Sequence, residues 1–288
     1  MLKAWILLVG ISCLITTISL AQDLDYQYQY AQEQYSNGNT KIALREYLRT
    51  YYFDRNSEYT NLPKEIAECF IATYDYGHSV EFYDHYLNQS SVNESDRFNA
   101  QLRKAQVLLL NEDPNAALIQ LLSTTAPANN KGSDRLQFLL AFTNLVNGDL
   151  ENGFDAIQSL SYIHQNHHDD LKVFRNKLEK NLNTKHNIPR LMSAVIPGTG
   201  QIVNGEYADA ANSMVLTGGL LFLLFDVAKE LTLIDALVSV GPFYFRYYLG
   251  GINNAHSGSI KKEKRKKSIL LNELLVFTKK CKEESSIE

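Results

Sequence analysis

Four polar residues in the C-terminal third of the chain are of types that could do chemistry. Gln201 and Asn204 can both donate and accept hydrogen bonds, and Asp209 and Arg246 carry opposite charges. All four occur beside long apolar stretches, where polar groups must find partners. Such a set could form a polar site that binds or transforms a small molecule. We keep this site as the alternative function, a membrane enzyme or transporter accessory, and take the chain to be non-enzymatic.

The run from His164 to Asp170 has the only metal-like composition in the sequence. His164 and His168 are spaced so that both could face one side of a helix and bind a divalent cation. The alternative is a polar turn, in which Asp169 or Asp170 lies near the N-cap of the next helix. We adopt the turn and expect no metal.

Other chemical sites find little support in the sequence. The glycine-rich stretch Pro197 to Gly205 lacks the Lys-Ser or Lys-Thr pair of a phosphate-binding loop. Cys69 and Cys281 lie in separate regions and make neither a zinc pattern nor a disulfide framework. The net charge of -4 gives no reason to expect nucleic acid. We therefore expect no cofactor, no nucleic acid and no small-molecule ligand for the main function.

The glycine-rich stretch also has consequences for the backbone. Its ordered residues are Pro197, Gly198, Gly200, Gln201 and Gly205. Glycine and proline at this density break a helix, while the flanking residues are too apolar for a loop in water. Broken backbone beside apolar segments indicates a stretch that dips into a membrane or caps a membrane-embedded helical hairpin.

Two apolar stretches follow, Ala208 to Phe225 and Leu231 to Gly250, separated by the short polar stretch Asp226 to Glu230. Each is near the ~20 residues that cross a bilayer as a helix. If they form an antiparallel pair about that polar turn, Asp209 and Arg246 come to matching depth. Because charges within spans usually pair, we expect these two to form an ion pair. A buried hairpin of a soluble protein is the alternative.

The first residues have the pattern of a secretory signal peptide. Lys3 is followed by an apolar run, and Ser19 and Ala21 place small residues where the signal peptidase needs them. Cleavage between Ala21 and Gln22 would export the chain. An uncleaved N-terminal anchor is the alternative.

Basic flanks of the apolar hairpin complicate its orientation. Lys261 to Lys267 would normally stay in the cytoplasm, and the region from Lys172 to Arg190 is also basic. The well-formed cleavage site carries more weight, so we expect an inner-membrane protein with its repeats in the periplasm. The terminal basic block either contacts anionic lipid or is a solvated tail.

A helix-turn-helix period runs from Asp23 to about Asn183. Turn residues recur roughly 35 to 39 positions apart, the spacing of helical-hairpin repeats; they are Gly38, Gly77, Asp113 and Gly148. With Ala31, Tyr35 and Ala43 around the first turn, this half of the chain resembles the tetratricopeptide repeat family. It departs from the family at Gly153, where alanine is usual, and no repeat has the complete signature. The resemblance implies a solenoid whose groove binds a protein or peptide.

The C-terminal region resembles a bacterial membrane-protein family of unassigned function. The shared residues are Pro197, Gly198, Gly200, Gln201 and Gly205, followed by Asp209 and Ala210. The end of the hairpin, Tyr248 to Ala255, is also similar. Val203 departs from the pattern, which usually has an aromatic residue. The resemblance implies a link to envelope or membrane-protein biogenesis and carries over no catalytic residues.

The sequence thus predicts an all-α chain in five parts: a signal peptide at 1–21, tetratricopeptide-like repeats at 22–183, a linker at 184–190, a Pro/Gly-headed membrane hairpin at 191–256, and a basic, partly helical tail at 257–288. Within the repeats, four hairpins are followed by a capping helix at Asp169 to Asn183. We expect an envelope-facing adaptor or assembly factor, with a protein partner in the repeat groove and lipid around the hairpin.

The mature protein is expected to begin at Gln22. N-terminal sequencing of protein recovered from its native membrane checks this, and a product that begins at Met1 would show that the apolar run is retained.

Overall fold

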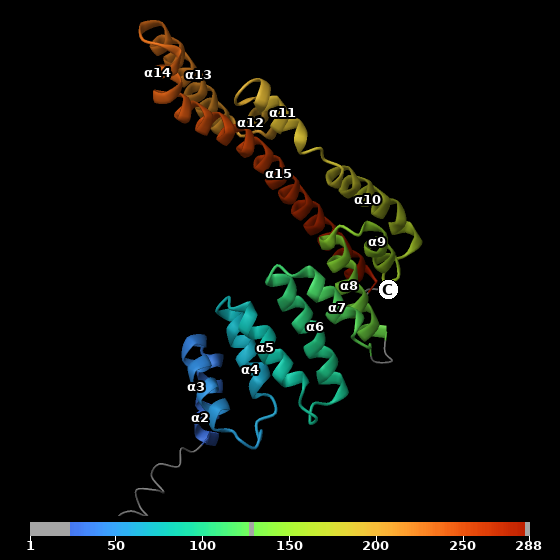
Figure 1. Ribbon diagram of the computed structural model, residues 1–288. Helices are drawn as coiled ribbons and strands as arrows, with labels where there is room; N and C mark the ends of the chain where they lie inside the picture. Colours follow the sequence, from blue (N-terminus) through green and yellow to red (C-terminus); the bar gives the residue numbers. More distant parts are fainter. Residues whose placement is uncertain (1–23, 127–129, 286–288) are drawn as a thin grey trace, which may run out of the picture. The chain divides into compact units, whose positions relative to one another are not determined.

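The structure, a computed structural model, describes residues 24–126 and 130–285 (Figure 1). Within these ranges it is all-helical, as the sequence predicts. The signal peptide and its cleavage site at Ala21 and Gln22 lie outside the described residues. The chain divides into two compact units, the first ending at Ser161 and the second starting at Tyr162.

The first unit is a succession of helices joined by short loops. They are α2 (Leu24–Ser36), α3 (Thr40–Phe53), α4 (Leu62–Ala72), α5 (Tyr76–Leu87), α6 (Glu94–Leu110), α7 (Pro114–Leu122), α8 (Asn130–Asn147) and α9 (Leu150–Gln158). Helices α2 and α3, α4 and α5, α6 and α7, and α8 and α9 pack as pairs, and each pair packs on the next.

The turn inside each pair has one recurring backbone structure. Its αL residue is Gly38, Tyr74, Glu112 or Gly148, each with positive φ. The next residue is Asn39, Asp75, Asp113 or Asp149, and its N–H donates to a carbonyl five residues back. This is the Schellman ending of a helix, followed at once by an N-cap for the next helix. Predicted turn residue Gly77 instead lies inside α5, because Tyr74 takes the αL position.

The interior of this unit explains one departure from the repeat pattern. A Cβ atom on Gly153 would lie 2.6 Å from Cδ2 of Leu145, a side chain that is fully buried. An alanine methyl group here would displace Leu145 from its packed position, which accounts for glycine at residue 153. Tyrosines contribute to this interior, with Tyr47, Tyr83 and Tyr86 among the largest fully buried side chains.

The second unit is organised along one long helix. Its elements are the turn η1 (Gln165–His167) and the helices α10 (His168–Leu182), α11 (Asn187–Val195), α12 (Thr199–Asn204), α13 (Tyr207–Glu230), α14 (Leu233–Ser239) and α15 (Gly241–Glu284). Helix α15 has 44 residues and packs in turn against α13 and α14, then α11 and α12, then α10.

Three predicted boundaries are wrong. The capping helix, here α10, belongs to the second unit and packs along α15, so the division falls before it and not at residue 183. The linker 184–190 already contains the start of α11, which begins at Asn187. The basic tail is no separate segment, because α15 runs without a break from the hairpin through Lys261–Lys267 to Glu284.

The predicted hairpin turn is also misplaced. Residues 226–230 continue α13, and the chain reverses at Leu231 and Thr232, where the Thr232 hydroxyl accepts the N–H of Asp235 at 3.2 Å. The predicted second span is divided between α14 and α15. In the described residues one helix, α13, is long and apolar enough to cross a membrane by length and composition.

The αL positions of the first unit yield a paired prediction. A non-glycine residue in αL costs about 1 kcal/mol, whereas glycine adopts it freely. Glu112→Gly should therefore raise the free energy of unfolding by up to ~1 kcal/mol, and Gly148→Ala should lower it by ~1 kcal/mol. Urea unfolding of the purified chain measures both; changes of the same sign would mean that the two turns are not equivalent.

Candidate functional site

The Pro197–Gly205 stretch forms two sharp corners around the short helix α12. Helix α11 ends before an extended Ile196, and Gly198 then takes a φ of +89°. Helix α12 ends at Gly205, whose φ is +85°, and α13 follows directly. Both glycines stand where an L-residue with a side chain would be strained. The sequence prediction of a broken backbone at this stretch is confirmed.

Gly200 is required for a different reason, the closeness of three chain segments. A Cβ atom there would lie 2.0 Å from the carbonyl oxygen of Pro189 in α11 and 2.7 Å from Cβ of Ala255 in α15. A Cβ on Gly198 would meet the carbonyl oxygen of Ala210 at 2.7 Å. Glycine therefore lets α12 sit against the backbones of its neighbours.

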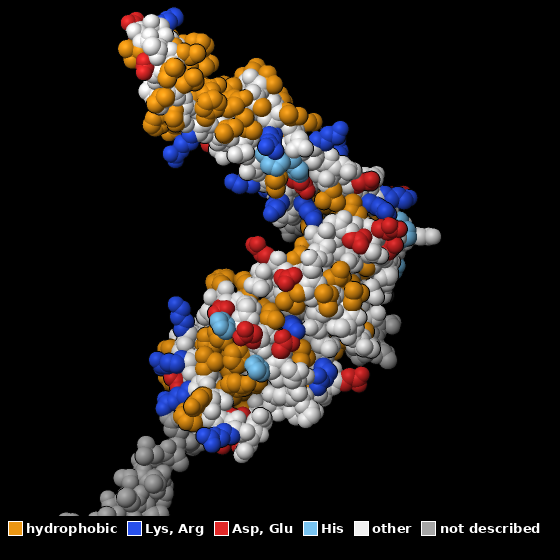
Figure 2. Space-filling view, in the orientation of Figure 1, with side chains coloured by type: hydrophobic (Ala, Val, Ile, Leu, Met, Phe, Trp, Pro, Cys, Tyr) orange, Lys and Arg blue, Asp and Glu red, His pale blue; other side chains and the backbone are white. Residues whose placement is uncertain are grey.

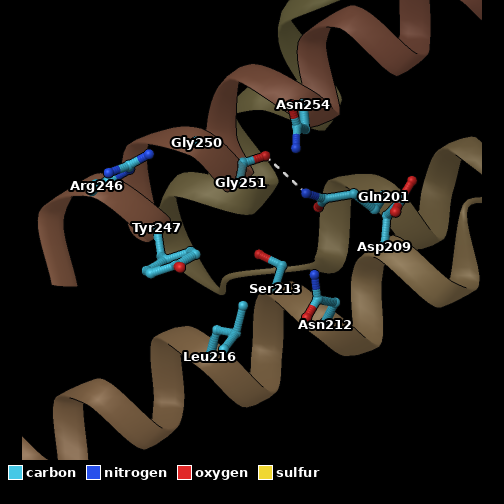
Figure 3. Close-up of a pocket in the computed structure, with 10 residues that line it drawn as sticks. All are labelled: Gln201, Asp209, Asn212, Ser213, Leu216, Arg246, Tyr247, Gly250, Gly251 and Asn254. Atoms are coloured by element: carbon cyan, nitrogen blue, oxygen red, sulfur yellow. Dashed lines mark hydrogen bonds between the residues drawn. The ribbon is translucent and has the colours of Figure 1, made fainter. Parts of the chain in front are cut away.

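Gln201 connects the same three helices through its buried side-chain amide, which is 1 % exposed. The hydroxyl of Ser193 in α11 donates to Oε1 of Gln201 at 2.9 Å and accepts the N–H of Gly200 at 3.0 Å. Nε2 of Gln201 donates to the carbonyl oxygen of Gly251 in α15 at 2.8 Å (Figure 3). Both ends of the amide are thus paired, as burial requires.

Further hydrogen bonds to α15 flank this amide. Nδ2 of Asn204 donates to the carbonyl of Ala255 at 2.7 Å, and Nζ of Lys262 donates to the carbonyl of Val203 at 2.8 Å. On the other side of Gln201, the hydroxyl of Tyr248 donates to the carbonyl of Ala194 at 2.6 Å. We call Ser193, Gly200, Gln201 and Asn204, with the α15 carbonyls that they contact, the crossing site.

A pocket of about 290 Å³ opens beside the crossing site, between α13 and α15. Its lining residues are Gln201, Asp209, Asn212, Ser213, Leu216, Arg246, Tyr247, Gly250, Gly251 and Asn254 (Figure 3). Three of the four polar residues singled out in the sequence thus meet at one pocket. Asn204 does not line it; its amide donates to the carbonyl of Ala255 in α15.

The predicted ion pair between Asp209 and Arg246 is not formed. Both side chains line the pocket, at opposite ends of the view in Figure 3, and no salt bridge joins them within the described part of the chain. The reason is the position of the turn: with the reversal at Leu231 and Thr232, α15 is offset from the register that would place the two charges face to face. The buried polar contacts between these helices are made by Gln201 instead.

The chemistry available to the pocket is hydrogen bonding. Among the described residues that line it there is no histidine, cysteine or lysine, and its charged groups are the carboxylate of Asp209 and the guanidinium of Arg246. Oγ of Ser213, at the wall of the pocket, is buried and has no hydrogen-bond partner among the described residues. A Cβ on Gly251 would approach it to 2.6 Å. The pocket can accommodate a polar molecule.

The histidine cluster forms the predicted polar turn. His164 caps the η1 turn, and Asp169 and Asp170 occupy the first turn of α10. Among the described residues no group of His, Cys, Asp or Glu is arranged to hold a metal ion.

Some members of the site were not identified from the sequence. Ser193 and the Gly251 carbonyl are as important to Gln201 as the motif glycines. Ser193 precedes Gln201 by eight residues, and the pair Gly250 and Gly251 allows close approach on α15. Whether these residues contact Gln201 depends on how the helices cross, which the sequence does not specify.

No family model, curated protein or solved structure matches the chain.

The close crossing predicts opposite effects for two glycine substitutions. Gly200→Ala places a methyl group against a backbone carbonyl, which cannot be relieved by a rotamer change, and should destabilise the second unit by ~3 kcal/mol. Gly250→Ala adds a methyl group where nothing lies within 4 Å and should stabilise α15 by ~0.5–1 kcal/mol. Thermal unfolding of the full chain in mild detergent distinguishes them. Equal tolerance of both changes would contradict the crossing.

Proposed function

We propose that this protein is a membrane-anchored adaptor or assembly factor, in which tetratricopeptide-like repeats bind a protein partner and the second unit fixes them to a bilayer. The observation that carries the proposal is the apolar surface of the second unit. Apolar side chains are exposed on successive elements of the second unit, among them Val195 at 82 %, Phe222 at 73 % and Val238 at 72 %. Apolar surface of this extent marks a membrane or protein interface.

The apolar surface has the position expected of a membrane hairpin. It covers α11, α13, α14 and the beginning of α15, and Lys and Arg side chains gather where it stops (Figure 2). Helix α13 supplies the membrane-length segment, and α14 with the start of α15 packs against it on the return. The charges of Asp226, Lys229 and Glu230 occur at the far end of α13, which suits a hairpin whose tip reaches the opposite interface.

The first unit offers a polar face for a partner. A groove of about 330 Å³ is lined mainly from α4, α6 and α8, the first helices of successive pairs, with Tyr83 of α5. Arg103 and Glu68 form a two-point ion pair across it, with Nη2 to Oε2 at 2.8 Å, and Tyr83 also donates to Glu68. Burial pushes the pKa of Glu68 upward, but the Arg103 and Tyr83 hydrogen bonds outweigh it and hold the pKa below its ordinary value. This wall is fixed and charged, and exposed Arg135 stands at its edge.

Orientation follows from the signal peptide. A cleaved signal exports the repeats, and two crossings by the hairpin return α15 to the same side. The adaptor would then face the periplasm from the inner membrane. The resemblance of the hairpin motif to an envelope-linked family supports the same compartment.

The pocket at the crossing site supports a second candidate, a membrane enzyme or transporter accessory. Gln201, Asp209 and Arg246 do converge on one cavity. A purified hairpin that binds or turns over a small molecule without the repeats would favour it over the adaptor.

The adaptor is tested by co-purification of the full chain from cross-linked, detergent-solubilised membranes. A partner held in the repeat groove should be reduced about tenfold by Arg135→Glu, because a rim charge in a protein interface is reversed. Lys41→Glu on α3, which is exposed and does not line the groove, makes the same charge change and should leave the partner bound. Equal recovery with both variants, or no protein recovered beyond the background of an untagged strain, would contradict the adaptor.

A further inference from the structure

Two adjoining grooves lie where α10, α11 and α15 pack together in the second unit. One, of about 390 Å³, lies between α10 and α15, and the other, of about 250 Å³, extends to α11 and α12. Asn181, Thr184 and Lys266 line both, so the two grooves are adjacent, and we treat them together. We call the pair the basic groove.

Lysines dominate its lining: Lys177, Lys180, Lys185, Lys262 and Lys266. Glu263 is the one acidic residue among the described residues that line it, and its Oε2 lies 2.6 Å from Nε2 of His186. One carboxylate against five lysines leaves the groove with an excess of positive charge.

The other polar groups of the wall are already used within the protein. Nδ2 of Asn181 donates to the carbonyl of Glu263 at 3.2 Å, and the Thr184 hydroxyl donates to the carbonyl of Asn181 at 2.7 Å. In contrast, Lys180, Lys185 and Lys266 make no salt bridge within the described residues. A ligand in this groove would thus meet several ammonium groups and a fixed wall, an arrangement that suits a phosphate.

Apolar residues border the groove on the side of the proposed membrane surface. Ile188 and Val203 line it and are 49 % and 45 % exposed, and they continue into the apolar surface of α11 to α13. Asn204, at the same wall, is followed almost directly by Tyr207, where the membrane-length helix α13 starts. The groove therefore lies at the level where the apolar part of the unit ends.

From this juxtaposition of lysines and apolar border we propose that the basic groove binds the phosphate headgroup of an anionic phospholipid, whose acyl chains lie along α11 and α13. The inference rests on the membrane anchoring proposed above. A free phosphate would use the lysines and leave the apolar border uncovered, whereas a phospholipid contacts both. The site would hold the second unit at a fixed depth and angle in the bilayer.

The test uses the full chain in detergent with phosphatidylglycerol added, and counts bound lipid by native mass spectrometry. Lys180→Gln with Lys266→Gln should weaken lipid retention about tenfold or more, because each lysine near an anionic headgroup contributes substantially. Lys261→Gln with Lys264→Gln is the matched control: it removes the same charge from the same basic region, but neither residue lines the groove. All four lysines are exposed, and circular dichroism verifies that both variants are folded.

Three outcomes would overturn the site. Equal losses in the two double variants would indicate diffuse charge attraction, and no loss in either would show that the groove is not used. Displacement of phosphatidylglycerol by inorganic phosphate at the same concentration would assign the groove to a free anion. Carbonate extraction of native membranes separates this inference from the proposed function: a chain that stays in the membrane without selective lipid retention refutes the groove alone, and a chain that is extracted refutes the anchor.

Discussion

The close approach of α12 to α11 and α15 at Gly200 is the constraint on which the second unit depends. Only a residue without a Cβ fits between the Pro189 carbonyl and Ala255, and that fit brings Gln201 within reach of both neighbours. The buried amide then has one partner on each helix, so a shift of any of them would leave a polar group unpaired. Three helices are thereby fixed as one piece, from which α13 and α14 project.

Helix α15 connects the apolar surface of the second unit to its basic region. Apart from Arg246, its first turns are largely apolar, with Phe243 and Leu249 about half exposed. Its middle carries the carbonyls that accept hydrogen bonds from Gln201 and Asn204. The basic run Lys261–Lys267 follows on the same rigid element. Apolar surface, crossing site and basic groove therefore occur in fixed order along one helix, which is what an anchor needs in order to define depth in a bilayer.

Local backbone chemistry was the part of this structure that the sequence could predict. Helix turns with Gly38 or Gly148, and the corners at Gly198 and Gly205, follow from residues that alone adopt positive φ at no cost.

Packing over longer range could not be predicted in the same way. The charged stretch Asp226–Glu230 resembles a turn, yet nothing in it breaks a helix, and the reversal occurs only at Thr232, whose capping of Asp235 was the available signal. Gly250 and Gly251 resemble a helix end but lie within α15, and at Gly251 a side chain would meet Ser213. The unit to which α10 belongs depends on which apolar surface it packs against, and this long-range packing cannot be read from the sequence of the helix itself.

The central claim, that the apolar end of the second unit lies within a membrane, is tested most directly by cysteine accessibility. In a chain whose buried Cys69 and Cys281 are replaced by alanine, single substitutions Phe222→Cys, Val238→Cys and Lys264→Cys are exposed to a membrane-impermeant maleimide in membrane fragments open on both faces. The account predicts rapid labelling at position 264, and labelling at 222 and 238 only after the membrane is dissolved in detergent. Labelling of all three positions at equal rates in intact membrane would contradict it.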